Sequence, residues 1–263
     1  MLESASSFGS LGPLELLAVG AAAVLGGAVN ALAGGGTLIT FPVLTAVGLP
    51  ALAANITNTV ALCPGHVGAT LAQAASLRGQ RKLLLVLVPA GIAGGLVGGV
   101  LLLHTGEHTF RDVVPLLLLF SSLLLASQEK IRAFLQERQR RRGGEGGHAR
   151  LAPFVVGTAA VYGGYFGAGL GVVLVAALGI VLDETLPRLN ALKQVVALVV
   201  NVAAAVFFLF SDQVNWMAPA AMAVGALAGG AIGGHMVTRV NVAALRWGMV
   251  ALGVVLALIY LVN

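Results

Sequence analysis

The chain has 263 residues, of which 58% are hydrophobic and 10% are charged. Soluble domains carry about 25% charged residues, so this composition excludes an ordinary soluble protein. The net charge of +5 does not indicate nucleic-acid binding, because seven of the 15 Lys and Arg residues lie in one central segment. Apolar runs near the roughly 20 residues that cross a bilayer recur along the chain. We therefore expect an all-α polytopic membrane protein embedded in a lipid bilayer.

Residues 1–127 form the first expected transmembrane repeat. It opens with an apolar segment, at about residues 14–47, that glycines interrupt at Gly34–Gly36. Paired segments of this kind mark discontinuous helices in transporters, so we expect a re-entrant hairpin of two part-length helices here. Three full crossings follow, at about residues 53–77, 83–104 and 110–128.

Residues 128–150 form a basic linker between the two repeats. Its Lys and Arg residues are followed by a glycine-rich run at residues 143–147. We expect the linker to be helical to about Arg142 and flexible beyond it. Because short cytoplasmic loops carry an excess of Lys and Arg, we place the linker in the cytoplasm. A topological anchor is its expected role, and lipid binding or regulation is the alternative.

Residues 151–263 form the second expected repeat. It also opens with a glycine-interrupted segment, which predicts a second hairpin at about residues 152–182, and Gly163–Gly171 holds the interruption. The stretch Val60–Leu62 recurs as Val196–Leu198. Features that recur in the same order indicate a duplication. Three further crossings are expected at about residues 187–210, 216–237 and 242–262.

Each half also contains a ladder of glycines spaced four residues apart. Residues at this spacing share one face of a helix, where small side chains let another helix approach closely. We therefore expect these glycines to mediate helix packing. The two ladders are Gly91, Gly95 and Gly99 in the first half and Gly225, Gly229 and Gly233 in the second.

An odd number of crossings in each half makes the two halves inverted relative to each other. That topology leaves Arg111 outside and places six other basic positions inside, namely Arg78, Arg81, Lys82, Arg188, Arg239 and Arg246. If each glycine-rich segment instead spans once, the halves are parallel with eight crossings, and Arg188 and Arg239 move outside. The positive-inside rule favours the inverted topology, and the parallel one stays open.

Breaks in membrane helices are candidate binding sites. They expose backbone N–H and C=O groups, which membranes tolerate only where these groups face protein, water or a ligand. The freed helix N-termini carry partial positive charge and attract anions. We therefore place Gly35, Gly36 and Gly169 at a binding site; tight packing is the alternative explanation for these glycines.

Lys193 is the strongest candidate site residue. It lies within an apolar stretch long enough to cross a bilayer, and charges at membrane depth usually line a cavity or a pathway. The nearest acidic residues, Asp183 and Glu184, come near the start of this helix, where they are poorly placed to neutralise it. A buried, unpaired cation indicates binding of an anion. The polar residues that accompany Lys193 at helical spacing are Asn190, Gln194 and Asn201.

The corresponding helix of the first half is dense in amides and hydroxyls, which donate hydrogen bonds to an oxyanion. In the duplication, Asn58 corresponds to Gln194 and Thr57 to Lys193, so these elements are expected to face each other. Helix capping and bonding between helices is the alternative role. The full set of first-half candidates is Asn55, Thr57, Asn58, Thr59, Asn30 and Thr37.

His66 is a candidate for a proton or polar relay, with a hydrogen-bonded structural histidine as the alternative. The single cysteine, Cys63, excludes an internal disulfide. No motif of a known catalytic class and no metal-ligand spacing occurs in the sequence. We therefore expect no enzyme activity, no metal and no cofactor.

The sequence resembles the TauE/SafE sulfite exporter family, also grouped with toluenesulfonate uptake permeases. The resemblance covers nearly the whole chain. It implies transport of a sulfur-containing anion, such as sulfite or an organosulfonate, across the bacterial inner membrane. The features that carry it are Gly34–Gly36 with Pro42, the turn at Gly48–Pro50 before Asn55–Thr59, the basic central linker, and the repeat with Gly163–Gly171 and Asn190–Gln194.

We therefore expect a secondary transporter, an exporter of a small sulfur-containing anion that works by alternating access. An anion channel or an uptake permease for another small organic anion is the main alternative, and a membrane-embedded enzyme or assembly subunit is a further one. The expected partners are the anion, the bilayer, a coupling ion (proton or sodium) and a second copy in a homodimer. Nucleic acid is not among them.

Overall fold

The computed structural model describes residues 11–32, 34–142, 149–235 and 242–262. Two sequence expectations, the flexible run at residues 143–147 and the position of Arg239, lie outside these residues. All regular structure in the described residues is helical. The helices are α1 Pro13–Leu32, α2 Thr37–Ala46, α3 Ala51–Ala72, α4 Arg81–Arg142, α5 Ala152–Tyr165, α6 Leu170–Val181, α7 Leu186–Phe208, α8 Met217–His235 and α9 Val242–Val262, with 3₁₀ turns η2 Ala74–Leu77 and η3 Ala149–Leu151.

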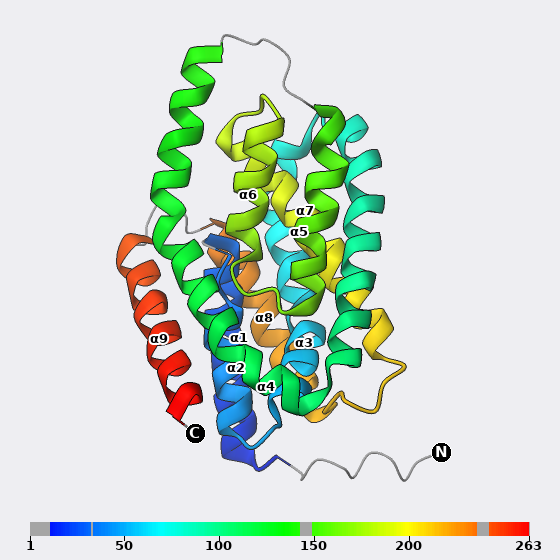
Figure 1. Ribbon diagram of the computed structural model, residues 1–263, viewed down its shortest axis with the longest axis vertical. Helices are drawn as coiled ribbons and strands as arrows, with labels where there is room; N and C mark the ends of the chain where they lie inside the picture. The colour runs from blue at the N-terminus through cyan, green and yellow to red at the C-terminus, as the bar shows by residue number, and fades with distance from the viewer. Residues whose placement is uncertain (1–10, 33, 143–148, 236–241, 263) are drawn as a thin grey trace.

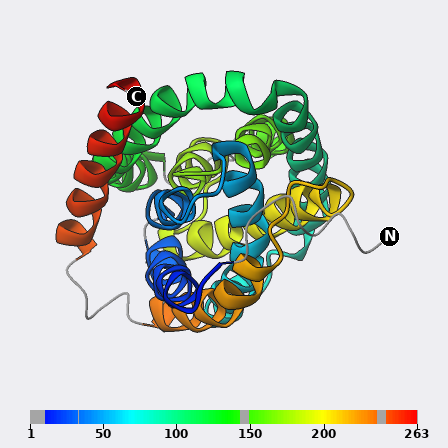
Figure 2. The same cartoon turned by 90° about the horizontal axis from the view of Figure 1, so that it is seen from below.

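The fold is that of a multi-pass membrane protein. Four helices, α1, α4, α7 and α9, are long and apolar enough to cross a bilayer. Seen from one end, α4, α8 and α9 lie toward the outside and α2 and α6 toward the middle (Figure 2). The outer helices expose large apolar side chains that water would not tolerate in such numbers but lipid does. They include Leu85, Leu116, Leu123, Val224, Leu258 and Leu261.

Helix α4 consists of two helices joined at a sharp kink. Gly106 adopts φ 72° and ψ 165° at the join, a conformation that side chains other than glycine rarely adopt. The first part, residues 81–105, and the second part, residues 107–142, therefore run in opposite directions along the bundle (Figure 1). The second part continues as helix to Arg142, as expected for the first part of the basic linker.

The two glycine-rich segments each interrupt a pair of helices. Helix α1 ends at Leu32 and α2 begins at Thr37, whereas residues 166–169 separate α5 from α6. Helices α2, α5 and α6 have 10, 14 and 12 residues and are part-length, as expected. Helix α1 differs from the expectation, because its 20 residues suffice to cross a bilayer alone.

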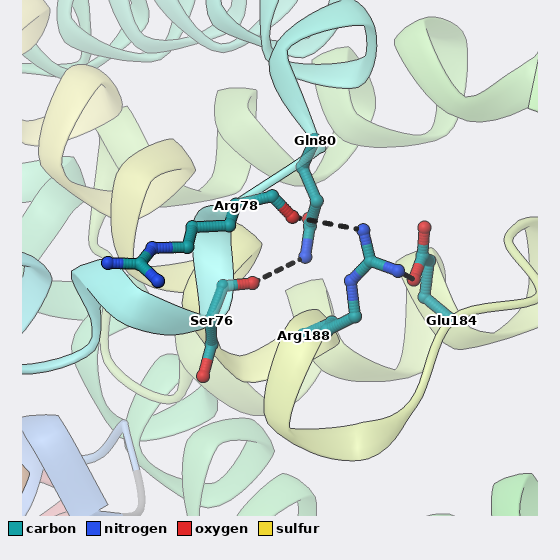
Figure 3. Close-up of polar contacts among 5 residues, drawn as sticks. All are labelled: Ser76, Arg78, Gln80, Glu184 and Arg188. Atoms are coloured by element: carbon teal, nitrogen blue, oxygen red, sulfur yellow. Dashed lines mark hydrogen bonds and ion pairs between the residues drawn. The ribbon is translucent and has the colours of Figure 1, made fainter.

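Helices α3 and α7 begin at opposite ends of the molecule. At the start of α3, the Glu107 carboxylate beside the α4 kink accepts hydrogen bonds from the N–H groups of Ala51 (2.8 Å) and Leu52 (2.9 Å). At the start of α7, Arg188 donates to the carbonyl of Arg78, which lies beyond the far end of α3 (Figure 3). The open ends of the α1–α2 and α5–α6 hairpins likewise face opposite ends of the molecule (Figure 1).

Each segment that takes part in the contact between Arg188 and Arg78 has a further polar interaction of its own. Arg188 forms an ion pair with Glu184 one turn earlier, at 3.0 Å, and Gln80 donates to the carbonyl of Ser76 at 2.9 Å. Glu184 is therefore paired with Arg188 at the start of the helix rather than with Lys193, as its position in the sequence suggested.

Glycines set how closely the helices approach. A Cβ atom on Gly229 of α8 would lie 2.1 Å from the Val24 carbonyl oxygen of α1, and one on Gly233 would lie 2.5 Å from the Ala28 carbonyl oxygen. Both distances are shorter than van der Waals contact. The expected packing role of the second ladder is thus confirmed.

The first ladder packs against a different kind of partner from the second. A Cβ on Gly95 would lie 2.7 Å from the Val200 carbonyl oxygen of α7. The glycines of α4 that face the hairpin helix α5 are Gly94 and Gly98, where a Cβ would lie 2.3 Å from the Gly157 carbonyl oxygen and 2.1 Å from that of Val161. The expected packing role of Gly95 is therefore confirmed, and adjacent glycines of α4 face different helices.

Replacing Gly229 by alanine should destabilise the protein, because overpacking a close helix contact costs about 1–3 kcal/mol. The control is Gly248→Ala in α9, where a Cβ meets no described atom within 4 Å; there the better helix propensity of alanine should preserve or raise stability. Thermal unfolding in detergent, followed by size-exclusion chromatography, measures both. Equal stability of the two variants would contradict the packing account.

Candidate functional site

Lys193 lies in the middle of α7 and is buried, with 3% of its surface exposed. Among the described residues, no Asp or Glu forms an ion pair with it. The acidic residue closest in sequence, Glu184, is paired with Arg188. A buried ammonium without a carboxylate partner is costly unless a counter-ion can reach it.

The two interrupted segments meet beside Lys193. A Cβ on Gly34 would lie 2.7 Å from the Cα atom of Gly171, and a Cβ on Gly171 would lie 3.5 Å from Lys193 Nζ. The backbone of Gly34 has φ 79°, a conformation that glycine adopts without strain. The contact therefore requires glycine on both sides, for conformation at Gly34 and for space at Gly171.

Two helix N-termini converge at this contact. Helix α2 begins at Thr37 and α6 begins at Leu170, and both residues line a cavity together with Lys193. Helix N-termini carry about half a positive charge each. The site thus combines an ammonium group with two positive helix ends, an arrangement that attracts an anion.

The cavity itself is small. Its volume is about 10 Å³, roughly what one water molecule needs. A sulfite-sized oxyanion can enter only if the surrounding elements move apart. The lining residues are Asn30, Gly34, Thr37, His66, Gly167, Leu170, Gly171, Lys193, Gln194, Ala197 and Asn201.

The polar residues that line the cavity lie on α1, α2, α3 and α7. Asn30 Nδ2 and His66 Nε2 lie 3.0 Å apart and form a hydrogen bond between α1 and α3. Gln194 donates to the carbonyl of Ala31 at 3.2 Å, which ties α7 to the end of α1. Asn201 donates within its own helix to Ala197 at 2.8 Å. The Nδ1 atom of His66 is buried without a hydrogen-bond partner among the described residues.

The polar residues of α3 at Asn55–Thr59 lie beside the cavity and do not line it. Asn58 donates to the Thr37 hydroxyl at 3.4 Å, and Asn55 donates to the Tyr165 carbonyl at 2.9 Å. The carbonyl oxygens of both amides are buried without partners in the described residues. Asn58 therefore adjoins the site through Thr37, and Asn55 adjoins it through the end of α5.

Thr57 and Thr59 have structural partners. The Thr57 hydroxyl accepts a hydrogen bond from the Asn215 N–H at 3.1 Å, so it faces the connection before α8 and not Lys193. Thr59 donates to the Asn55 carbonyl in the preceding turn. Neither side chain caps α3, since the Glu107 carboxylate occupies the first-turn N–H groups.

Of the predicted site residues, the structure brings Asn30, Thr37, His66, Lys193, Gln194 and Asn201 together around the cavity. Asn190 is half-buried and does not line it. The predicted glycines lie near it but face elsewhere: Gly35 toward Leu125 and Met249, Gly36 toward Gly26, and Gly169 toward Ser121. Their neighbours Gly34, Gly167 and Gly171 line the cavity instead.

Sequence reasoning missed the support behind the second connection. Ser121 of α4 and Tyr162 of α5 both donate to the carbonyl of Ala168, and their oxygens are 2.9 Å apart. This fixes the connection from two helices. A serine within an apolar helix and a tyrosine six residues before the acceptor gave no recognisable pattern in the sequence.

Residues 19–260 match the sequence profile of the family described as Sulfite exporter TauE/SafE. The chain belongs to this family. It is 26% identical over 243 residues to the probable membrane transporter protein YfcA of Escherichia coli strain K12, which covers 90% of this chain and 86% of that protein. No solved structure matches the chain.

Two further relatives have similar descriptions. A probable membrane transporter protein of Haemophilus influenzae is 28% identical over 218 residues, covering 80% of each chain. The probable membrane transporter protein ORF9 of a Sinorhizobium species is 27% identical over 223 residues, covering 81% of this chain and 79% of that one. Together with the helical fold, family membership supports a multi-pass membrane transporter, a class that is generally not enzymatic.

Gly171→Ala should destabilise the contact between the two connections, because the added methyl group meets both Gly34 and the Lys193 side chain. We expect a loss of about 1–3 kcal/mol, as for other overpacked sites. Gly157→Ala in α5 is the control, since a Cβ there is 3.8 Å from its nearest neighbour. Thermal unfolding in detergent compares the two. Unchanged stability of Gly171→Ala would contradict the close contact.

Proposed function

We propose that this protein is a secondary transporter that exports a small sulfur-containing anion, such as sulfite or an organosulfonate. The observation that carries the proposal is Lys193, a buried ammonium facing two helix N-termini with no carboxylate paired to it in the described residues. The family name supports sulfite as the first substrate to test.

In this proposal the anion binds between the two interrupted connections. Lys193 supplies the charge, and the N–H groups that begin α2 and α6 supply directed donors. Gln194, Asn201 and the Thr37 hydroxyl line the same space and complete the coordination. Such a site recognises oxygen atoms and negative charge rather than the rest of the ligand, which suits small oxyanions.

Transport requires the site to open alternately to each side. In this mechanism the two halves are inverted repeats, and each contributes a re-entrant hairpin. Three observations support this: the hairpins open in opposite directions, their connections meet at Lys193, and Arg188 lies beside Arg78. The closely packed glycine contacts between α1 and α8 and between α4 and α5 are surfaces along which the halves can move.

The proposal includes a topology. With residues 128–150 in the cytoplasm of a bacterial inner membrane, the contact between Arg78 and Arg188 lies on the cytoplasmic side. The membrane potential, negative inside, then drives an anion outward by about 2.3 kcal/mol per charge per 100 mV. Export therefore needs no coupling ion, whereas uptake needs a proton or sodium. The repeat boundaries and the homodimer remain predictions.

A channel for small anions is the competing function. The small cavity volume of about 10 Å³ favours a carrier, because an anion must displace protein groups to enter. The distinction is kinetic: a carrier saturates and exchanges substrate by counterflow, whereas a channel does neither.

Lys193→Ala should abolish anion exchange, since Lys193 is the one Lys or Arg among the described residues that line the cavity. The measurement is counterflow of sulfite, sulfate, sulfoacetate and taurine in proteoliposomes under anaerobic conditions. Lys130→Ala is the matched control, because Lys130 is exposed on α4. Lys193→Gln tests charge with a smaller change of volume. Saturable exchange that survives in both Lys193 variants would refute the proposed site.

Topology is tested by labelling single cysteines with a membrane-impermeant maleimide in right-side-out vesicles. In a Cys63→Ser background, Asp183→Cys before α7 should be protected and Asp212→Cys after α7 should react. Both positions are exposed, so access depends on the side of the membrane. The parallel topology with eight crossings requires the opposite pattern.

A further inference from the structure

A second buried cation lies close to the candidate site, on α9. Arg246 exposes 4% of its surface, and its Nη1 atom lies 2.7 Å from Oε1 of Glu129 on α4. The Glu129 side chain is 64% exposed, so this carboxylate reaches from the surface to a buried guanidinium. The Nε atom of Arg246 is buried without a partner among the described residues. One carboxylate therefore leaves the guanidinium incompletely satisfied.

This ion pair lies one helical turn from the interrupted connection. A Cβ on Gly35 would lie 2.8 Å from a Leu125 methyl carbon of α4 and 3.4 Å from the Met249 sulfur of α9. Glu129 follows Leu125 by four residues and Arg246 precedes Met249 by three, so each lies about one turn, roughly 5 Å, along its helix. Because Glu129 and Arg246 contact each other, α4 and α9 are adjacent both at Gly35 and at this ion pair.

Arg132 extends the positive charge toward Lys193. It follows Glu129 by three residues, on the same face of α4. It is partly buried, and its charge interacts with Arg246, with Glu129 and with Lys193. Arg132 and Arg246 therefore both interact with the exposed Glu129 carboxylate. Arg132 therefore lies electrostatically between the Glu129–Arg246 ion pair and Lys193.

We propose that Arg132 and Arg246, the arginine pair, form a second anion site on the cytoplasmic approach to Lys193. Its ligand is a small oxyanion of the kind that the proposed function assigns to the central site, and the inference rests on that function. Without the ligand, the Glu129 carboxylate binds the Arg246 guanidinium and so competes with the anion. An incoming oxyanion replaces it, using the bidentate donor geometry of arginine, and then passes to Lys193.

A purely structural ion pair makes a different prediction from an anion site. If the Glu129–Arg246 ion pair only holds α4 to α9, removing either partner lowers both the stability of the protein and its transport rate. If Glu129 competes with substrate, removing the carboxylate improves binding, whereas removing the guanidinium impairs it. The signs of the two effects therefore separate the explanations.

The test is sulfite uptake into inside-out vesicles, which presents substrate to the cytoplasmic face. Glu129→Gln should lower the KM about threefold or more, and Arg246→Gln and Arg132→Gln should each raise it about tenfold, which corresponds to 1.4 kcal/mol. Lys130→Gln, one residue from Glu129 and exposed, should leave the KM unchanged. Arg246→Lys keeps the charge and controls for folding. Parallel changes in Glu129→Gln and Arg246→Gln, or no change in either, overturn the proposal.

Equilibrium binding separates this proposal from the proposed function. Purified Lys193→Ala protein lacks the charge of the central site, yet it should still bind radiolabelled sulfite weakly. Adding Arg246→Gln to that variant should abolish the residual binding, with both proteins shown to be monodisperse. No residual binding in Lys193→Ala overturns the arginine pair. Binding at the arginine pair without transport by the wild type would sink only the proposed function.

Discussion

The site depends on one electrostatic constraint, the burial of an ammonium group where two broken helices meet. Lys193 is desolvated, and within the described residues its surroundings provide helix N-termini and amides but no paired carboxylate. All these groups favour negative charge, so the site as a whole is more stable with an anion present. Differential stabilisation of this kind is what allows a ligand to shift the balance between conformations.

Close packing makes this arrangement geometrically feasible. Backbone segments can meet beside Lys193 only because Gly34 and Gly171 lack side chains. The same principle operates at the contacts of α8 with α1 and of α4 with α5, where glycines bring helices within reach of each other's carbonyl groups. In a membrane, where apolar side chains gain little from leaving lipid, such backbone proximity is a main source of helix association.

Much of this organisation could be predicted from periodicity and composition. The breaks near Gly34–Gly36 and Gly167–Gly171, the helix to Arg142 and the burial of Lys193 all follow local rules. Which face of a helix meets which partner does not. Thr57 was expected opposite Lys193 but contacts Asn215, and adjacent glycines of α4 face different helices. These details depend on contacts between residues far apart in the sequence, such as Thr57 and Asn215 at 158 positions, for which no local pattern exists.

Glu107 illustrates the same limit. Its carboxylate caps α3 across the kink of α4, although in sequence it is an ordinary charge in a polar turn. The role depends on a glycine conformation that brings two distant segments together. Local sequence can predict that the N-terminus of α3 needs acceptors, but not which chain segment supplies them.

The most direct test of the central claim is to locate the anion. Selenite is a close chemical analogue of sulfite, and its selenium can be found by anomalous scattering in a crystal of the protein soaked at saturating concentration. The account predicts an anomalous peak beside Lys193 Nζ, between the connections at Gly34 and Gly171. A peak elsewhere with none at Lys193, or no peak despite measured binding, would contradict it.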